Sequence, residues 1–366
     1  MMNANTDEYG RLTPMLAAIE ALVRCESPSE DLAACRSVVT LASDIATRVL
    51  GTPAQIREVE GRPVFWWGSN SPKVLVLAHL DTVWPIGSFT PLWSVDGDVV
   101  RGPGVFDMKA GFVQALFALK GIEGDVALVA TTDEEVGSHS SKALIKDLSS
   151  QASAVLVLEA SLDGKVKTGR KGTAMYQIAV HGLASHAGLE PEKGINATTE
   201  IAHITLQLAA LEDASHGTTV VPTTLRSGTT TNTVPDLAVL DIDARSFSQD
   251  DLHRVDAAVR ALKPTLAGAR IEVTGGLNRP PLQPSSTAKL YEIAEKVAAS
   301  IGMAPLGCAE VGGASDGNFA AAAGAEVLDG LGAVGGGAHA ANEWVSLASI
   351  QERSDFLHAF IKELLV

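Results

Sequence analysis

The sequence has few cysteines and few basic residues. Its three cysteines, Cys25, Cys35 and Cys308, are odd in number and form no C-x-x-C pair, so we expect no disulfide framework and a reducing compartment. The 28 Lys and Arg residues are outnumbered by 43 Asp and Glu residues, which gives a formal net charge of −15. Nucleic acids and anionic membranes both bind basic surfaces, so the composition excludes both as expected partners.

Long uninterrupted hydrophobic runs are also missing. The Ala- and Gly-rich stretch 318–341 contains Glu326 and Asp329, which argues against a membrane span. The N-terminal segment MMNANTDEYGRL has no basic region followed by an apolar core, so we expect no signal peptide and a cytoplasmic protein. A chain of 366 residues is long enough for two domains.

Several strand-like segments end at groups that can bind a cation. The apolar run KVLVLAHLD (73–81) ends on His79 and Asp81. Asp107 follows the Gly-rich segment that begins at Arg101, the run DVALVATT leads to Asp133, Glu134 and Glu135, and the run AVLVL leads to Glu159. Because open sheets place their chemistry at the carboxyl ends of buried strands, we expect these side chains to converge on one rim of one sheet.

The order of the predicted elements indicates two domains. Strands and helices alternate up to about residue 172 and again from 284 to 366, which is typical of an α/β layer fold. Residues 173–283 instead predict the order β-α-β-β-α-β, which is that of a ferredoxin-like domain. We therefore predict an α/β domain of residues 1–172 plus 284–366, interrupted by a ferredoxin-like insertion at 173–283.

Two imidazoles and three carboxylates suit a pair of divalent metals that share a carboxylate bridge. The candidate ligands are His79, Asp107, Glu135, Glu159 and His339. The histidines favour zinc, although a set so rich in carboxylates would also accept cobalt or manganese. Asp81 is placed to orient His79, and Glu134 is left as a base that could deprotonate a metal-bound water.

Other interpretations of the same residues stay open at this point. Asp133, Glu134 and Glu135 could form a solvated loop without a metal. The segment GASDG fits a nucleophile elbow with Ser315 as the nucleophile and His339 downstream, which would indicate a serine hydrolase. The segment GLGAVG (330–335) fits a dinucleotide-binding fingerprint, although the sequence after it is a poor helix start.

Seven ordered motifs resemble those of a known superfamily. They are HLDTVW, GPGVFDMKAG, TTDEEVGS, LEAS, GLASHAG, GGASDGN and GGGAHAANEW, and the match spans the chain from about residue 73 to 345. The series is similar to that of the aminoacylase and glutamate carboxypeptidase superfamily of dinuclear zinc amidohydrolases. Within it, the pattern is closest to the bacterial folate-hydrolysing glutamate carboxypeptidases. The resemblance implies a zinc-peptidase catalytic domain with an inserted lid and dimerisation domain, and a homodimer.

The resemblance also implies a role for each residue of the cluster. His79, Asp107 and Glu159 would bind one metal, and Asp107, Glu135 and His339 would bind the other, with Asp107 as the bridge. Glu134 would be the general acid and base, and Asp81 the residue that orients His79. A cis peptide bond is expected between Asp107 and Met108.

Further residues are assigned to the substrate by resemblance. His186 matches a lid histidine that stabilises the tetrahedral intermediate, in some members from the neighbouring subunit. Arg245 matches an arginine that holds the free carboxylate of the substrate, and Asn232 and Gly313 are weaker matches.

The implied activity is metal-dependent cleavage of an N-acyl amino acid or peptide that releases a C-terminal amino acid, with glutamate favoured. A broader N-acyl amino acid amidohydrolase or dipeptidase, and a catalytically silent binding homologue, are the alternatives.

Overall fold

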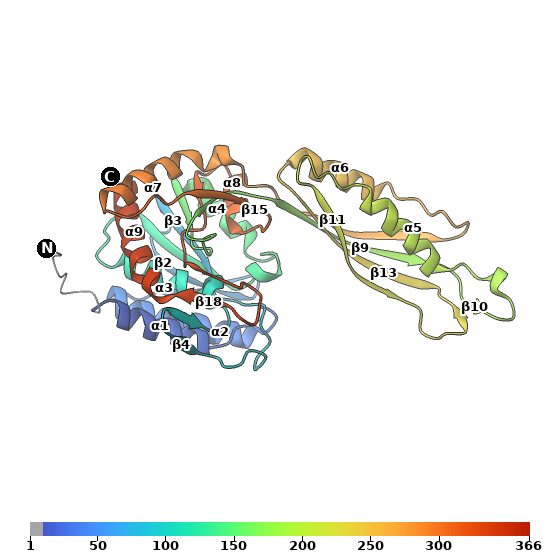
Figure 1. Cartoon of the computed structure of the whole chain (residues 1–366), viewed down its shortest axis with the longest axis horizontal. Helices are drawn as coiled ribbons and strands as arrows, with labels where there is room; N and C mark the ends of the chain where they lie inside the picture. The colour runs from blue at the N-terminus through green and yellow to red at the C-terminus, as the bar shows by residue number, and fades with distance from the viewer. Residues whose placement is uncertain (1–9) are drawn as a thin grey trace. The chain divides into compact units, whose positions relative to one another are not determined.

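The computed structural model describes residues 10–366 (Figure 1). Most of the N-terminal segment from which we expected no signal peptide, residues 1–9, lies outside the described residues. The chain divides into two compact units. The first runs to Gly169 and continues with Gln283–Val311 and Ser315–Val366, and the second comprises Arg170–Leu282 and Gly312–Ala314.

The first unit is built on a six-stranded sheet with the order β1-β2-β6-β3-β7-β16. The pairs β6–β3, β3–β7 and β7–β16 are parallel, whereas β1–β2 and β2–β6 are antiparallel. All residues of β3 and β6 are buried, as expected for strands covered by helices on both faces. The strands are β1 (Gln55–Val59), β2 (Arg62–Gly68), β3 (Val74–His79), β6 (Val126–Thr131), β7 (Ala154–Val157) and β16 (Val327–Leu328).

Amphipathic helices supply the apolar cover of this sheet. The helix α2 shows how the sequence sets the bounds: Asp31 accepts the Ala33 and Ala34 N–H groups at its start, and Gly51 ends it with a left-handed φ of 75°. The helices are α1 (Leu12–Arg24), α2 (Leu32–Leu50), α3 (Ala110–Leu119), α4 (Lys142–Gln151), α7 (Ala288–Ser300), α8 (Asp316–Ala322) and α9 (Leu347–Leu365).

Smaller elements complete the first unit. A second sheet has the order β17-β18-β5-β4, and β15 pairs with β8. These strands are β4 (Ser94–Asp96), β5 (Val99–Arg101), β8 (Val166–Arg170), β15 (Cys308–Val311), β17 (Gly335–Gly336) and β18 (Trp344–Ser346). Three short helical turns are η1 (Val105–Lys109), η2 (Glu134–Val136) and η4 (Pro284–Ser286).

The second unit has a four-stranded antiparallel sheet with the order β11-β13-β9-β14. Together with its two helices, the chain order is β-α-β-β-α-β, as the sequence predicted. Apolar residues of α5 and α6 share one buried core with alternate residues of the strands, so both helices cover one face of the sheet (Figure 1). The elements are β9 (Gly172–His181), β10 (Ser185–His186), η3 (Pro191–Lys193), α5 (Ala197–Ala209), β11 (Thr219–Ser227), β12 (Thr233–Val234), β13 (Leu237–Ser246), α6 (Gln249–Arg260) and β14 (Arg270–Arg279).

The mixed α/β fold with a ferredoxin-like insertion is the predicted fold class. The strand β1 has little signal in the sequence, because QIREV is an exposed edge strand rich in polar side chains, with no buried residue in it. Within residues 10–366, no helix is both long and apolar enough to cross a lipid bilayer.

Candidate metal centre and active site

The carboxyl ends of three neighbouring parallel strands bring several predicted site residues together. His79 is the last residue of β3 and pairs with Thr131 at the end of β6. Glu134 and Glu135 lie in the turn η2 that follows β6, and Glu159 lies two residues after β7. This part of the cluster forms at one edge of one sheet, as the sequence indicated.

Asp107 reaches the cluster from a different element. We expected it to end a strand of the same sheet, but it lies in the π-helical turn η1, which follows β5 of the smaller sheet. That expectation was wrong because the segment before Asp107 is a Gly-rich turn and not a strand. The peptide bond between Asp107 and Met108 is cis, as expected.

The two oxygens of the Asp107 carboxylate face different side chains. Oδ1 lies 3.2 Å from Nε2 of His79, and the same nitrogen is 3.7 Å from Oε1 of Glu159. Oδ2 lies 3.6 Å from Nε2 of His339, which is 3.0 Å from Oε2 of Glu135. One carboxylate oxygen toward each of two donor sets is the arrangement that a bridging ligand needs.

The donor atoms are close enough to hold metal ions. His79, Asp107 and Glu135 offer ligand atoms within 4.8 Å of one another, and so do His79, Glu134 and Glu159. Imidazole nitrogens mixed with carboxylate oxygens form a donor set that suits zinc. Glu134 is therefore near enough to be a ligand itself, so distance alone does not separate a ligand from a base at this position.

Burial and charge act in opposite directions on the protonation of the cluster. Burial raises the pKa of Glu135 to about 7, and the hydrogen bond with Glu135 raises the pKa of His339 to about 9. Burial disfavours the protonated form of His79, but hydrogen bonds with Asp107 and Asp81 outweigh it and raise that pKa well above its usual value. The cluster therefore favours positive charge among its carboxylates, which protons or divalent cations can supply.

Asp81 fixes the ring of His79. Nδ1 of His79 lies 3.1 Å from the backbone carbonyl oxygen of Asp81 and 3.4 Å from its Oδ1. The other carboxylate oxygen of Asp81 accepts hydrogen bonds from Ser29 Oγ at 2.7 Å and from the Glu135 N–H at 3.2 Å. With Nδ1 held in this way, Nε2 of His79 is directed at the other ligands.

Two buried charged residues that the sequence did not single out hold the ligand loops. The Glu343 carboxylate accepts the N–H groups of Gly104, Phe106 and Asp107 at 2.9, 2.9 and 3.1 Å. Arg353 donates to the carbonyl oxygens of Gly330 and Gly332 at 2.7 and 3.0 Å, in the loop that leads to His339. Glu343 could have been noticed in the sequence as an acid four residues after His339. Its backbone partners could not, because they lie more than 200 residues earlier in the chain.

The remaining predicted site residues belong to the second unit. His186 is exposed in β10, and its Nδ1 accepts the N–H groups of Gly188 and Leu189, both at 3.1 Å. Arg245 forms two hydrogen bonds with Asp243, at 2.7 and 2.8 Å, and a further one with Gly312 O at 3.3 Å. These contacts leave their roles as predictions.

The two weaker matches make backbone contacts within the same unit. The carbonyl oxygen of Asn232 accepts the Ala187 N–H at 2.9 Å. The carbonyl oxygen of Gly313 accepts a hydrogen bond from Arg170 at 2.9 Å. Neither contact assigns a part in substrate binding.

The serine-hydrolase interpretation does not fit the surroundings of Ser315. Its side chain is buried at the N-terminus of α8, where it caps the helix and donates to Asp329 at 2.6 Å. A nucleophile must be exposed to substrate and activated by a neighbouring base, so this serine has a structural role. The GLGAVG segment leads into the strand β17 and a turn rather than a helix, which excludes the dinucleotide fingerprint.

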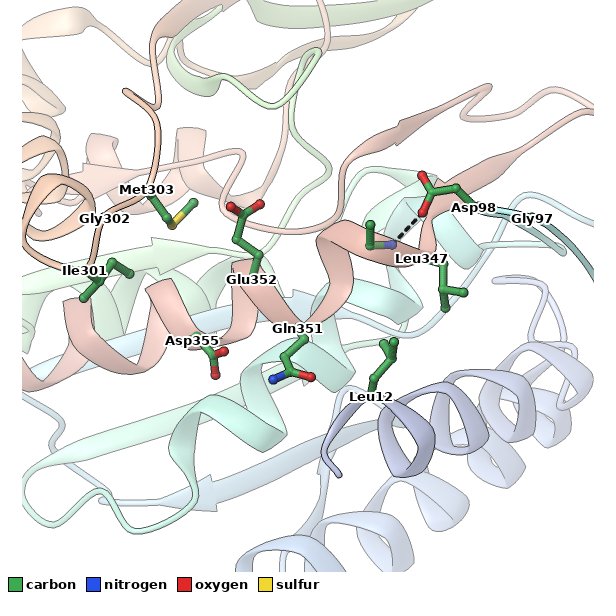
Figure 2. Close-up of a pocket in the computed structure, with 11 residues that line it drawn as sticks. Leu12, Gly97, Asp98, Ile301, Gly302, Met303, Leu347, Gln351, Glu352 and Asp355 are labelled. Carbon is green, nitrogen blue, oxygen red and sulfur yellow. Dashed lines mark hydrogen bonds between the residues drawn. The ribbon is translucent and has the colours of Figure 1, made fainter. Parts of the chain in front are cut away.

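Figure 2 shows a pocket of about 710 Å³ elsewhere in the first unit. Its lining residues come from the β4–β5 turn, the segment after α7, and α1 and α9. The Ala348 N–H donates to the Asp98 carboxylate at 2.7 Å, which satisfies one of the first N–H groups of α9. Because the lining includes none of the predicted site residues, this pocket is separate from the cluster of candidate metal ligands.

The matched family is Peptidase family M20/M25/M40, whose model covers residues 75–363. The chain belongs to this family. It is similar to carboxypeptidase G2 from Pseudomonas sp. (strain RS-16), with 31% identity over 305 residues, which cover 78% of this chain and 72% of that protein. The resemblance to the aminoacylase and glutamate carboxypeptidase superfamily, drawn from the seven motifs, is therefore confirmed at the level of the family.

Two solved structures resemble almost the whole chain. Aminopeptidase PepT from Bacillus cereus has a TM-score of 0.76 and 21% identity, with 97% of this chain and 99% of that chain covered. The M20 family metallo-carboxypeptidase Sso-CP2 from Sulfolobus solfataricus has a TM-score of 0.78 and 18% identity, with 96% and 99% covered. At 21% and 18% identity, these likenesses show the fold of this chain and do not identify its substrate.

Proposed function

We propose that this M20 family member is a zinc-dependent amidohydrolase of the carboxypeptidase type. It would release a C-terminal amino acid, glutamate being the first candidate, from an N-acyl amino acid or a peptide. The observation that carries the proposal is the Asp107 carboxylate, whose two oxygens face His79 on one side and His339 on the other. The similarity to carboxypeptidase G2 supports the choice of reaction.

The donor sets on the two sides of Asp107 would hold two divalent ions. His79 and Glu159 would share one with Asp107, and Glu135 and His339 would share the other. Zinc is the first choice, with cobalt and manganese as alternatives. Bound there, the ions would supply the Lewis acidity that polarises the scissile carbonyl and lowers the pKa of a water molecule.

Three side chains of the first unit would transfer protons or hold the candidate ligands in place. Glu134, buried in η2 near His79 and Glu159, would take a proton from water and pass it to the nitrogen of the scissile amide. Asp81 would hold His79 in the orientation that directs Nε2 at the cluster. Glu343 would hold the backbone of Asp107 through the three N–H groups that it accepts.

Residues of the second unit are proposed to act on the substrate. Because Nδ1 of His186 accepts two backbone N–H groups, Nε2 carries the proton and can donate to a developing oxyanion. Arg245 would bind the free carboxylate of the substrate, with Asn232 and Gly313 contributing polar contacts. A role of this unit as a lid and dimerisation domain, a homodimer, and a cytoplasmic location belong to the same proposal.

The test is a panel of substrates that share one acyl group and differ in the amino acid released. Zinc-loaded enzyme is expected to release glutamate fastest, and an amidated glutamate derivative is expected to react poorly. A preference for another amino acid would favour the broader N-acyl amino acid amidohydrolase or dipeptidase. No release from any member would favour a catalytically silent homologue.

A further inference from the structure

A groove of about 800 Å³ lies beside the metal cluster, entirely within the first unit. We call it the Glu135 groove, because Glu135 forms part of its wall. Its lining includes three apolar residues that are exposed to solvent. Leu32, Val83 and Ile86 are 43%, 39% and 59% exposed. Exposed aliphatic side chains gathered around one hollow are typical of a binding site for an apolar group.

Hydrogen bonds hold the two walls of the groove together. Thr82 donates its N–H to Ser27 O at 2.8 Å, and Ser29 donates its N–H to Thr82 O at 3.2 Å. The hydroxyl of Ser29 also donates to the Asp81 carboxylate at 2.7 Å. The groove is therefore tied to the residue that orients His79, and it is formed before any ligand binds.

The loop that carries Val83 and Ile86 is anchored from its other side. The indole N–H of Trp84 donates to the Glu343 carboxylate at 3.1 Å. The Trp84 ring also packs edge-on against Phe89, with 4.9 Å between the ring centroids. The exposure of Val83 and Ile86 is thus a property of an anchored loop.

The charge of the groove decides which half of an amide substrate it suits. Its titratable side chains are Glu30, Asp31 and Glu135, and its lining contains no lysine, arginine or histidine among the described residues. The Asp31 carboxylate already accepts the first N–H groups of α2. A released amino acid carries a free carboxylate, which this lining would repel, whereas an uncharged acyl group meets no such penalty.

We propose that the Glu135 groove binds the acyl side of the scissile amide and selects uncharged, apolar acyl groups of several carbon atoms over short or anionic ones. This inference rests on the proposed amidohydrolase function and adds the class of acyl group. Each methylene that enters the groove leaves water and contacts Leu32, Val83 or Ile86, which favours the longer chain.

The experiment compares N-hexanoyl, N-acetyl and N-succinyl forms of the amino acid that the zinc-loaded enzyme releases fastest. The hexanoyl form is expected to exceed both others in kcat/KM by about tenfold or more. Val83→Ser and Ile86→Ser should each lower the ratio of hexanoyl to acetyl activity. Ile56→Ser, at an aliphatic residue of β1 that is 45% exposed, is the matched control and should leave the ratio unchanged.

A charge substitution tests the second half of the inference. Glu30→Lys should raise succinyl activity relative to hexanoyl activity, because it places a cation at the groove. If amide hydrolysis is robust but acetyl or succinyl substrates are preferred, the groove assignment is overturned and the proposed function stands. If no N-acyl amino acid is hydrolysed, both the groove assignment and the proposed function are wrong. If the serine variants change the mass of the protein in solution but not the ratio of hexanoyl to acetyl activity, the Glu135 groove is an interface between two copies of this chain and its assignment to the acyl group is wrong.

Discussion

Glu134 and Glu135 are adjacent in the sequence and both lie near His79, but their other neighbours in space differ. Glu135 lies 3.0 Å from His339, whereas Glu134 groups with His79 and Glu159. A turn after one strand can therefore serve both sides of the cluster. Substitution of each acid separates the residue that binds metal from the residue that moves protons.

The first prediction concerns Glu134. Glu134→Gln should lower kcat by a factor of about 10² to 10⁴, because the amide cannot accept the proton of the attacking water. The variant should keep the metal content of the wild-type protein, measured by elemental analysis of the same samples. Loss of metal along with activity would instead make Glu134 a ligand, and normal turnover would remove it from the mechanism.

His186 is exposed in β10, where its ring can reach a substrate. His186→Ala should lower kcat by about two or three orders of magnitude if Nε2–H stabilises the oxyanion. His203→Ala, at an exposed position on α5, is the matched control and should leave kcat unchanged. An unchanged kcat for His186→Ala would end the assignment.

Elements of two different sheets bring the candidate ligands together. The strand ends of β3, β6 and β7 supply His79, Glu135 and Glu159, while the turn η1 supplies Asp107. The two meet because Glu343, just before β18, accepts the N–H groups that begin η1. The position of the bridging carboxylate thus depends on a buried acid that does not itself belong to the ligand set.

A prediction about Glu343 follows from these contacts. Glu343→Ala leaves three backbone N–H groups without their acceptor, so we expect a lower thermal midpoint and a zinc affinity reduced by about 10- to 100-fold. Both are measured by titrating zinc into metal-free protein and by thermal unfolding. Glu352→Ala, at an exposed acid on α9, is the control, and equal affinities in the two variants would contradict the role.

Much of the element pattern could be predicted from the sequence, because buried strands such as β3 are continuous apolar runs. The ligands at the strand ends followed from the same pattern. The position of Asp107 in η1 could not be predicted from the sequence, because it depends on the pairing of β5 with β18, two strands that lie far apart in the chain. Glu343 and Arg353 were missed for the same reason: their partners are backbone groups far away in the chain.

The chain joins an α/β unit, which carries the cluster of histidines and carboxylates, with a ferredoxin-like unit. The second sheet presents apolar side chains to solvent on the face away from its helices, among them Met175 and Val221, with 40% and 46% exposure. Such a face supports the proposed homodimer, which a solution mass at micromolar concentration would test. A monomer mass would refute it.

We expect this M20 family member to need two metal ions for activity, one on each side of Asp107. The most direct measurement is amide hydrolysis during stepwise addition of zinc to chelator-stripped enzyme, with bound zinc determined at each step. We predict two bound zinc ions per chain and full activity only near the second equivalent. Full activity with one bound ion, or activity that persists in the stripped enzyme, would contradict the account.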